Sequence, residues 1–167
     1  MGAKVSKTSG IAAADSIAGL NLSENAKHAA ELLLAQFPSD IRFTSGRRSA
    51  AKQASAMATN VAAKRKWIQL TYKDTPQRTA LQKWIDDHPE AIRADQITAG
   101  LVKVMNSWKE ADLRNFSRHM SGDAFDVAPV PGPKGEQIKQ AISVLPKLQW
   151  HTFNEGGLEI WHAQFEA

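Results

Sequence analysis

The order of helical and strand-like segments constrains the fold of this chain most strongly. Up to about residue 117, apolar residues recur mainly at helical intervals, as in "LSENAKHAAELLLAQF" (22–37). The exception is "IRFTSG" (41–46), where alternating β-branched and aromatic residues predict a short strand. Strand-like segments cluster after residue 117. Helices first and strands late in the sequence predict an α+β fold.

Local signals predict where several elements begin and end. Pro38 closes the helix over 22–37, and Thr75 followed by Pro76 starts a helix in "PQRTALQKWIDDH". Asp95 opens a further helix. In the last third, "AFDVAPV" is strand-like and "GEQIKQAISVLPKL" forms one helix. The segments "WHTF" and "LEIWHAQF" flank the turn "NEGG" and therefore predict a hairpin.

Length and composition predict one domain with a short arm. The 167 residues suffice for a single hydrophobic core but are few for two. Residues 1–20 are small, polar and poorly periodic, so we expect a loosely ordered arm, with the domain spanning 21–167. The start of the chain lacks the apolar stretch of a secretory signal peptide, and no transmembrane helix is predicted.

The absence of cysteine and the basic charge restrict the possible sites and partners. Without cysteine the chain forms no disulfide and no thiolate zinc site, so a metal site must use histidine and carboxylates. The net charge of +4 and the pI of about 9.4 favour a polyanionic partner. Nucleic acid, anionic lipid and a bacterial cell envelope all fit this charge.

Two separated stretches combine histidines with acids in a strand-like context. In "SRHMSGDAFDVAP" (117–129) a turn over Ser121, Gly122 and Asp123 lets His119 and Asp126 converge. On the predicted strand Ala124 and Asp126 share one face, and Phe125 and Val127 point to the core.

His162, in the second stretch, completes a candidate zinc site. Two histidine nitrogens and one carboxylate oxygen, from His119, Asp126 and His162, leave a fourth position for water, as in catalytic zinc sites. Glu159 lies three residues before His162 and is the candidate general base. A regular strand places these two residues on opposite faces, so this role requires a bulge or a position at the start of the strand.

These residues resemble the motifs of the zinc D,D-peptidases. Residues 117–126 reproduce the pattern Ser-x-His-x-x-Gly-x-Ala-x-Asp, and "EIWH" (159–162) is similar to the Glu-x-x-His motif. "SGRRSAAKQ" (45–53) resembles the segment Ser-Gly-Tyr-Arg-Ser-x-x-x-Gln, which places Arg48 on the family arginine and Gln53 on its glutamine. Arg47 stands where the family has an aromatic residue. The three segments follow the family order.

The resemblance implies a hedgehog/D,D-peptidase type of fold, in which a small antiparallel sheet carries one Zn²⁺ ion. It implies that Glu159 is the base, that Arg48 stabilises the oxyanion or holds the substrate carbonyl, and that Ser117 and Gln53 position substrate. The helices between Arg48 and His119 are expected to form an extra wall of the cleft.

The family cleaves stem peptides of bacterial peptidoglycan. It includes D-alanyl-D-alanine carboxypeptidases, dipeptidases of vancomycin-resistance type and phage L-alanyl-D-glutamate endolysins. Between the carboxypeptidase and the endopeptidase we favour the endopeptidase, because a phage must cut cross-linked wall. We expect a monomer that binds the anionic envelope, without nucleic acid and without membrane insertion. It would stay in the host cytoplasm until released to the wall, or would be carried on the virion.

Two other classes of function stay open on the sequence. A related fold can hold zinc in a protein used only for binding, although the acid at position 159 favours catalysis. A nucleic-acid-binding domain would explain the high pI but not the placed histidines and acids. Zinc-dependent release of peptide from purified wall separates catalysis from both alternatives.

Overall fold

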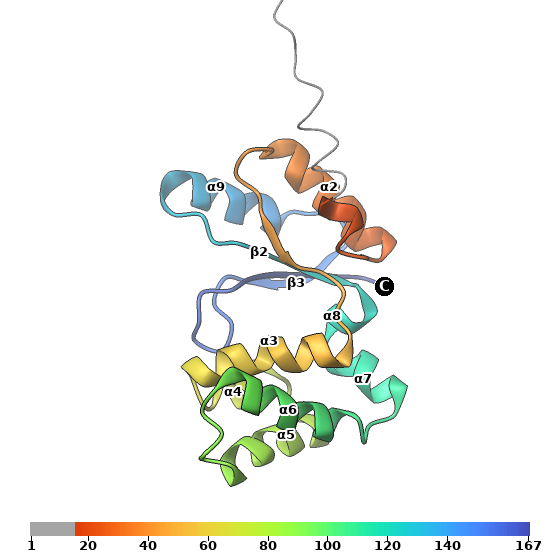
Figure 1. Ribbon diagram of the computed structural model, residues 1–167. Helices are drawn as coiled ribbons and strands as arrows, with labels where there is room; N and C mark the ends of the chain where they lie inside the picture. Colours follow the sequence, from red (N-terminus) through yellow and green to blue (C-terminus); the bar gives the residue numbers. More distant parts are fainter. Residues whose placement is uncertain (1–15) are drawn as a thin grey trace, which may run out of the picture.

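The computed structural model describes residues 16–167 and confirms a mixed α+β fold (Figure 1). Four strands form one antiparallel sheet with the order β1-β2-β4-β3. The strands are β1 (Phe43–Ser45), β2 (Ala124–Val127), β3 (Leu148–Thr152) and β4 (Trp161–Phe165). The central pair, β2 and β4, is therefore hydrogen-bonded on both edges and provides the most constrained positions of the sheet.

Helices cover both faces of this sheet (Figure 1). On one side lie α2 (Glu24–Gln36) and α9 (Gly132–Ser143). The other side holds α3 (Ala50–Ala63), α4 (Trp67–Thr71), α5 (Pro76–Asp87), α6 (Ala94–Met105) and α7 (Glu110–Phe116). The single-turn helix α8 (Arg118–Ser121) leads directly into β2.

The predicted helix signals are confirmed at several boundaries. Helix α2 lies within the expected range 22–37. Helix α5 begins with Pro76, and the Thr75 side chain accepts a hydrogen bond from the backbone N–H of Arg78. The predicted hairpin is also present, because β3 and β4 pair antiparallel on either side of a turn that contains Gly156 and Gly157.

Two hydrophobic cores flank the sheet. Phe125 and Val127 of β2 pack into the first core, under α2 and α9, as the alternation of the strand predicts. Side chains of α3, α4, α5 and α6 form the second core. Asp126 belongs to neither core and is directly opposite His162 on β4. The two predicted metal ligands therefore lie where the sheet meets the second helical layer.

The packed part of the chain begins earlier than predicted. Residues 1–15, most of the predicted arm, lie outside the described residues. Ile17 is only 4% exposed and belongs to the first core, and the backbone N–H of Arg47 donates to Leu20 O at 2.8 Å. Residues 17–20 are thus part of the domain, because one apolar side chain there finds a place in the core. Within 16–167 no helix has the length and apolar character needed to cross a membrane.

We expect Gly156→Ala to destabilise the protein more than Gly132→Ala. Both glycines have positive φ, 59° and 74°, so alanine costs about 1–2 kcal/mol at either position. At Gly156 the new Cβ would also lie 2.5 Å from Cδ1 of Trp67 and would meet the Thr71 hydroxyl, whereas nothing lies within 4 Å at Gly132. Overpacking should add about 1–3 kcal/mol, measured by urea unfolding of the two variants. Equal losses would contradict the close packing of this loop.

Candidate metal centre and its pocket

The three predicted metal ligands come together from three elements. Asp126 on β2 and His162 on β4 are cross-strand partners, so their side chains project from the same face of the sheet. His119 comes from α8, whose N-cap Ser117 accepts the backbone N–H of His119 and whose C-cap Gly122 is left-handed with φ 84°. This short helix returns the chain toward the sheet immediately before β2. All three side chains are buried.

The hydrogen bonds of His119 determine which ring nitrogen faces the site. Its Nδ1 lies 2.8 Å from the carbonyl oxygen of Gly46, which only accepts, so Nδ1 carries the proton. In neutral His119, Nε2 is then an acceptor, yet it lies 3.2 Å from Oδ1 of Asp126, another acceptor. Burial lowers the pKa of His119 and favours this neutral form. Two facing acceptors need a cation between them, which a metal ion would supply.

The ligand atoms of the three residues converge on one point. Nδ1 of His162 lies 2.9 Å from the same Oδ1 of Asp126, and Nε2 of His162 lies 3.4 Å from Oε1 of Gln164. One ligand atom from each residue lies within 4.8 Å of the others. The donor set of two imidazoles and one carboxylate suits zinc and other divalent transition metals. His119, Asp126 and His162 therefore could hold a metal ion.

The carboxylate of Asp126 is kept ionised by its surroundings. Burial alone would raise its pKa, but the neighbouring imidazoles of His119 and His162 hold the pKa below its usual range. For His162, burial acts to lower the pKa, and the hydrogen bond and charge of Asp126 outweigh it, so the pKa is raised. His162 and Asp126 thus stabilise each other, whereas neutral His119 presents an acceptor to the same carboxylate oxygen.

Arg48 holds the second oxygen of Asp126. Its Nη2 donates to Oδ2 at 2.7 Å, its Nε donates to Ser45 Oγ at 2.7 Å, and its Nη1 donates to Gln53 Oε1 at 3.3 Å. The guanidinium is thereby fixed in one orientation, with Oδ1 left to face the histidines. Contacts of this kind orient metal ligands and tune their affinity.

The structure distinguishes Arg48 from its neighbour Arg47. The Nε of Arg47 donates to the carbonyl oxygen of Asn21, on the exterior, and the ion pair with Asp126 is formed by Arg48. Arg48 is therefore the arginine of this site, as the family motif implies. Its three bonds position Asp126, and two of its five N–H donors stay free on a residue that lines the cavity. The implied role in holding a substrate carbonyl stays a prediction.

Gln53 is placed differently from its predicted role. It is fully buried and does not line the pocket, so it cannot contact substrate as the family motif implies. Its Oε1 accepts from Arg48, and its Nε2 donates to the hydroxyl of Tyr72 at 2.8 Å. Gln53 instead continues a chain of hydrogen bonds from Asp126 through Arg48 to Tyr72.

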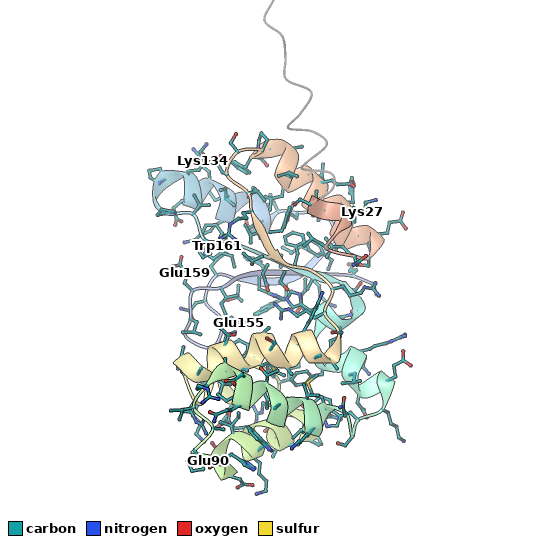
Figure 2. The ribbon with its side chains drawn as sticks, viewed as in Figure 1. Lys27, Glu90, Lys134, Glu155, Glu159 and Trp161 are labelled. Carbon is teal, nitrogen blue, oxygen red and sulfur yellow. The ribbon has the colours of Figure 1, made fainter. Side chains whose placement is uncertain are left out.

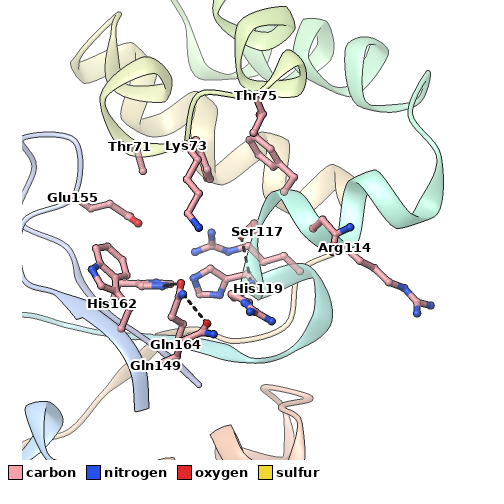
Figure 3. Close-up of a pocket in the computed structure, with 16 residues that line it drawn as sticks. Thr71, Lys73, Thr75, Arg114, Ser117, His119, Gln149, Glu155, His162 and Gln164 are labelled. Atoms are coloured by element: carbon pink, nitrogen blue, oxygen red, sulfur yellow. Dashed lines mark hydrogen bonds between the residues drawn. The ribbon is translucent and has the colours of Figure 1, made fainter. Parts of the chain in front are cut away.

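A cavity of about 740 Å³ opens beside His119 and His162 (Figure 3). Ser117 lines it, and its contact with substrate stays a prediction. Residues 71–75 and 114–118 form one side, so the helices between Arg48 and His119 contribute a wall, as predicted. Gln149 and Trp150 of β3 form another side, and the Trp150 ring centroid lies 5.7 Å from that of His162. The volume is typical of a site for a small ligand or a short peptide.

The predicted general base, Glu159, lies outside this pocket. It is exposed, it precedes β4, which begins at Trp161, and it does not line the cavity. Glu155 lies in the cavity instead, with its side chain directed toward the site (Figures 2 and 3). The assignment of Glu159 as base is therefore corrected: the spacing to His162 suggested it, but a turn after residue 155 brings the earlier acid inward.

Glu155 is held in place by the loop that carries it. Its backbone N–H donates to Leu158 O at 2.9 Å, and its carbonyl oxygen accepts from Nε1 of Trp67 at 2.9 Å. Gly156 and Gly157, both with positive φ, allow the tight turn between Glu155 and Leu158. Burial raises the pKa of Glu155, and the charge of His162 only partly offsets this. A carboxyl group with a raised pKa near a metal site suits proton transfer.

Sequence reasoning also missed Tyr72 as part of the site. Tyr72 lines the cavity, stacks on Phe116 with ring centroids 4.3 Å apart, and accepts a hydrogen bond from Gln53. Burial raises its pKa, so its hydroxyl stays protonated and is available to donate. It is the single tyrosine of the chain, but nothing in its local sequence connects it with the histidines.

No protein-family model, no curated protein and no solved structure matches this chain.

We expect zinc to bind through His119, Asp126 and His162. Zinc at a hundred times its dissociation constant should raise the free energy of unfolding by about 2.7 kcal/mol, measured by thermal unfolding with and without a chelator. The triple alanine variant should lose this stabilisation. Alanine at His28, His88 or His151 should preserve it, because those side chains lie outside the ligand group. Stoichiometric zinc in the dialysed triple variant would show that the metal binds elsewhere.

Arg48→Lys should weaken zinc binding by about tenfold to a hundredfold, because lysine cannot make the three bonds that fix Asp126. Arg47→Lys is the matched control, with the same chemical change one residue away, and should bind zinc as the parent protein does. Competition with a chromophoric chelator measures both affinities. Equal affinities of the two variants would mean that Arg48 does not support the site.

Proposed function

We propose that this protein is a metal-dependent peptidase that cleaves stem peptides of bacterial peptidoglycan, with the D,D-peptidase type of fold. The observation that carries the proposal is the convergence of Nε2 of His119, Oδ1 of Asp126 and Nδ1 of His162 beside a cavity that also contains Glu155. Three protein ligands next to an open cavity are the arrangement of catalytic metal sites, whereas structural zinc sites use four protein ligands.

The proposed chemistry is hydrolysis of a peptide bond. A divalent cation such as Zn²⁺, when bound by the three ligands, supplies Lewis acidity that lowers the pKa of water and polarises a carbonyl group. Glu155 accepts the proton of the attacking water and later delivers it to the leaving amine. Its burial suits this double task, because a raised pKa brings the carboxyl group closer to the pH at which it must both accept and donate.

Other side chains of the cavity would stabilise and orient the substrate. The hydroxyl oxygen of Tyr72 accepts a hydrogen bond from the side-chain amide of Gln53, and its hydrogen can therefore be donated to an oxyanion. Ser117 lies on the cavity wall, where it can contact the substrate backbone. Arg48 contributes by holding Asp126 in place. Tyr72 is therefore a second candidate for the oxyanion role that the family motif gives to Arg48.

Within this class we favour an L-alanyl-D-glutamate endopeptidase of phage endolysin type, and the basic charge suits the anionic envelope that such an enzyme must reach. Release from the host cytoplasm at lysis, or transport on the virion, would bring it to the wall. A D,D-carboxypeptidase of the same family is the alternative, and a metal-holding binding domain is the non-catalytic one. The acid that lines the cavity favours catalysis over binding alone.

Glu155→Gln should reduce hydrolysis of purified peptidoglycan by about a hundredfold or more, because the amide cannot accept the proton. Glu159→Gln, the matched control in the same loop, should retain activity because its side chain is exposed outside the cavity. Both variants should bind zinc. The reverse result, loss of activity only in Glu159→Gln, would assign the base to Glu159 and overturn the role of Glu155.

Mass spectrometry of the soluble products identifies the bond that is cleaved. A new N-terminal D-glutamate indicates the endopeptidase, and loss of a terminal D-alanine indicates the carboxypeptidase. Release should stop on chelation and return with added zinc. A zinc-loaded parent protein that releases neither product from walls of several bacteria would contradict a peptidase and support the binding domain.

A further inference from the structure

The lining of the cavity carries an excess of positive charge. Four cationic side chains line the cavity, Arg48, Lys73, Arg114 and Arg118, and Glu155 is the single acid among its lining residues within 16–167. Arg48 is neutralised by Asp126 at 2.7 Å. Arg114 pairs with Glu110, and Arg118 lies 3.7 Å from Asp123. The remaining cation, Lys73, is exposed and lies on the linker between α4 and α5.

Lys73 has no partner that would neutralise it. Lys66 and Lys83 form ion pairs at 2.8 Å and 2.6 Å, but Lys73 takes part in none of the ion pairs within the described part of the chain. Its side chain extends from the upper wall into the cavity, on the side of His119 and His162 (Figure 3). An unpaired ammonium group facing a cavity attracts an anionic group of a ligand.

The backbone that carries Lys73 is fixed relative to the metal ligands. Tyr72, the preceding residue, stacks on Phe116 and is joined to Asp126 through Gln53 and Arg48. Its carbonyl oxygen also accepts from Nη1 of Arg78 at 3.4 Å. The chain therefore sets the separation between the ammonium group and the metal ligands, while the flexible side chain adjusts the final contact.

We propose that Lys73 forms a subsite for a carboxylate on the residue next to the scissile bond. This inference rests on the proposed function and specifies its substrate class: peptides with a free carboxylate, in preference to the same peptides with a carboxamide. A D-glutamyl residue in amide linkage to L-alanine carries such a carboxylate, and its amidated form does not. The protein would therefore discriminate between walls with free and with amidated glutamate.

Binding of two non-hydrolysable peptides tests the subsite independently of catalysis. Both are ketomethylene analogues of L-alanyl-D-glutamyl peptides, one with free carboxylates and one with carboxamides. Isothermal titration calorimetry with the zinc-loaded full chain should give about tenfold tighter binding of the carboxylate form. High salt should reduce this preference, since the lysine is exposed. Equal affinities for the two analogues would overturn the proposal, as would tighter binding of inorganic phosphate.

Variants identify the residue responsible. Lys73→Met should abolish the preference for the carboxylate form, and Lys73→Arg should retain it. Lys103→Met, on the exposed surface of α6 and outside the cavity, makes the same change in net charge and should leave the preference intact. If Lys73→Met and Lys103→Met behave alike, the subsite is not at Lys73.

The outcome is separable from that of the proposed function. If the protein prefers the carboxylate analogue through Lys73 but releases no wall peptide, the subsite is supported and the proposed peptidase activity is contradicted. If the protein instead cleaves walls with free and with amidated glutamate at equal rates, the peptidase activity is supported and the subsite is contradicted. Purified walls with free and with amidated glutamate provide this comparison.

Discussion

The carboxylate of Asp126 is the group on which the rest of the site depends. It is buried and ionised, and such a charge is stable only when nearby groups compensate for it. One oxygen faces His119 and His162, and the other receives Arg48. Because these partners come from α8, β4 and the segment before α3, a single carboxylate connects the sheet to the second helical layer. Removing one partner would leave the buried charge less well compensated, which is destabilising.

This arrangement also explains why the site occupies the boundary between two cores. Each hydrophobic core is closed on its own side of the sheet, and the polar side chains of β2 and β4 project between the sheet and α3. Gln53 and Tyr72 extend the hydrogen bonds from Asp126 into the second layer. The second helical layer therefore has two roles. Arg48, at its start, holds Asp126 by a hydrogen bond, and other residues of the layer form a wall of the cavity that would face a substrate.

The sequence predicts the α+β class, most helices and the three ligands, because these depend on periodicity and on motifs within a few residues. It does not predict the position of Glu155, which depends on the turn at Gly156 and Gly157 and on a hydrogen bond from Trp67, 88 positions away. The spacing to His162 therefore pointed to Glu159. For the same reason Gln53 was assigned to substrate, since a motif gives residue order and not the depth at which a side chain is buried.

The position of the second helical layer within the chain has a kinetic consequence. Helices α3 to α7 are consecutive and pack on one another, so they form from local contacts, whereas Arg48 and Asp126 are 78 positions apart and meet only when β1 pairs with β2. Closing so long a loop is slow relative to local helix packing. The ligand group would then be completed late in folding, after the transition state. A bound metal ion should accordingly slow unfolding far more than it accelerates folding.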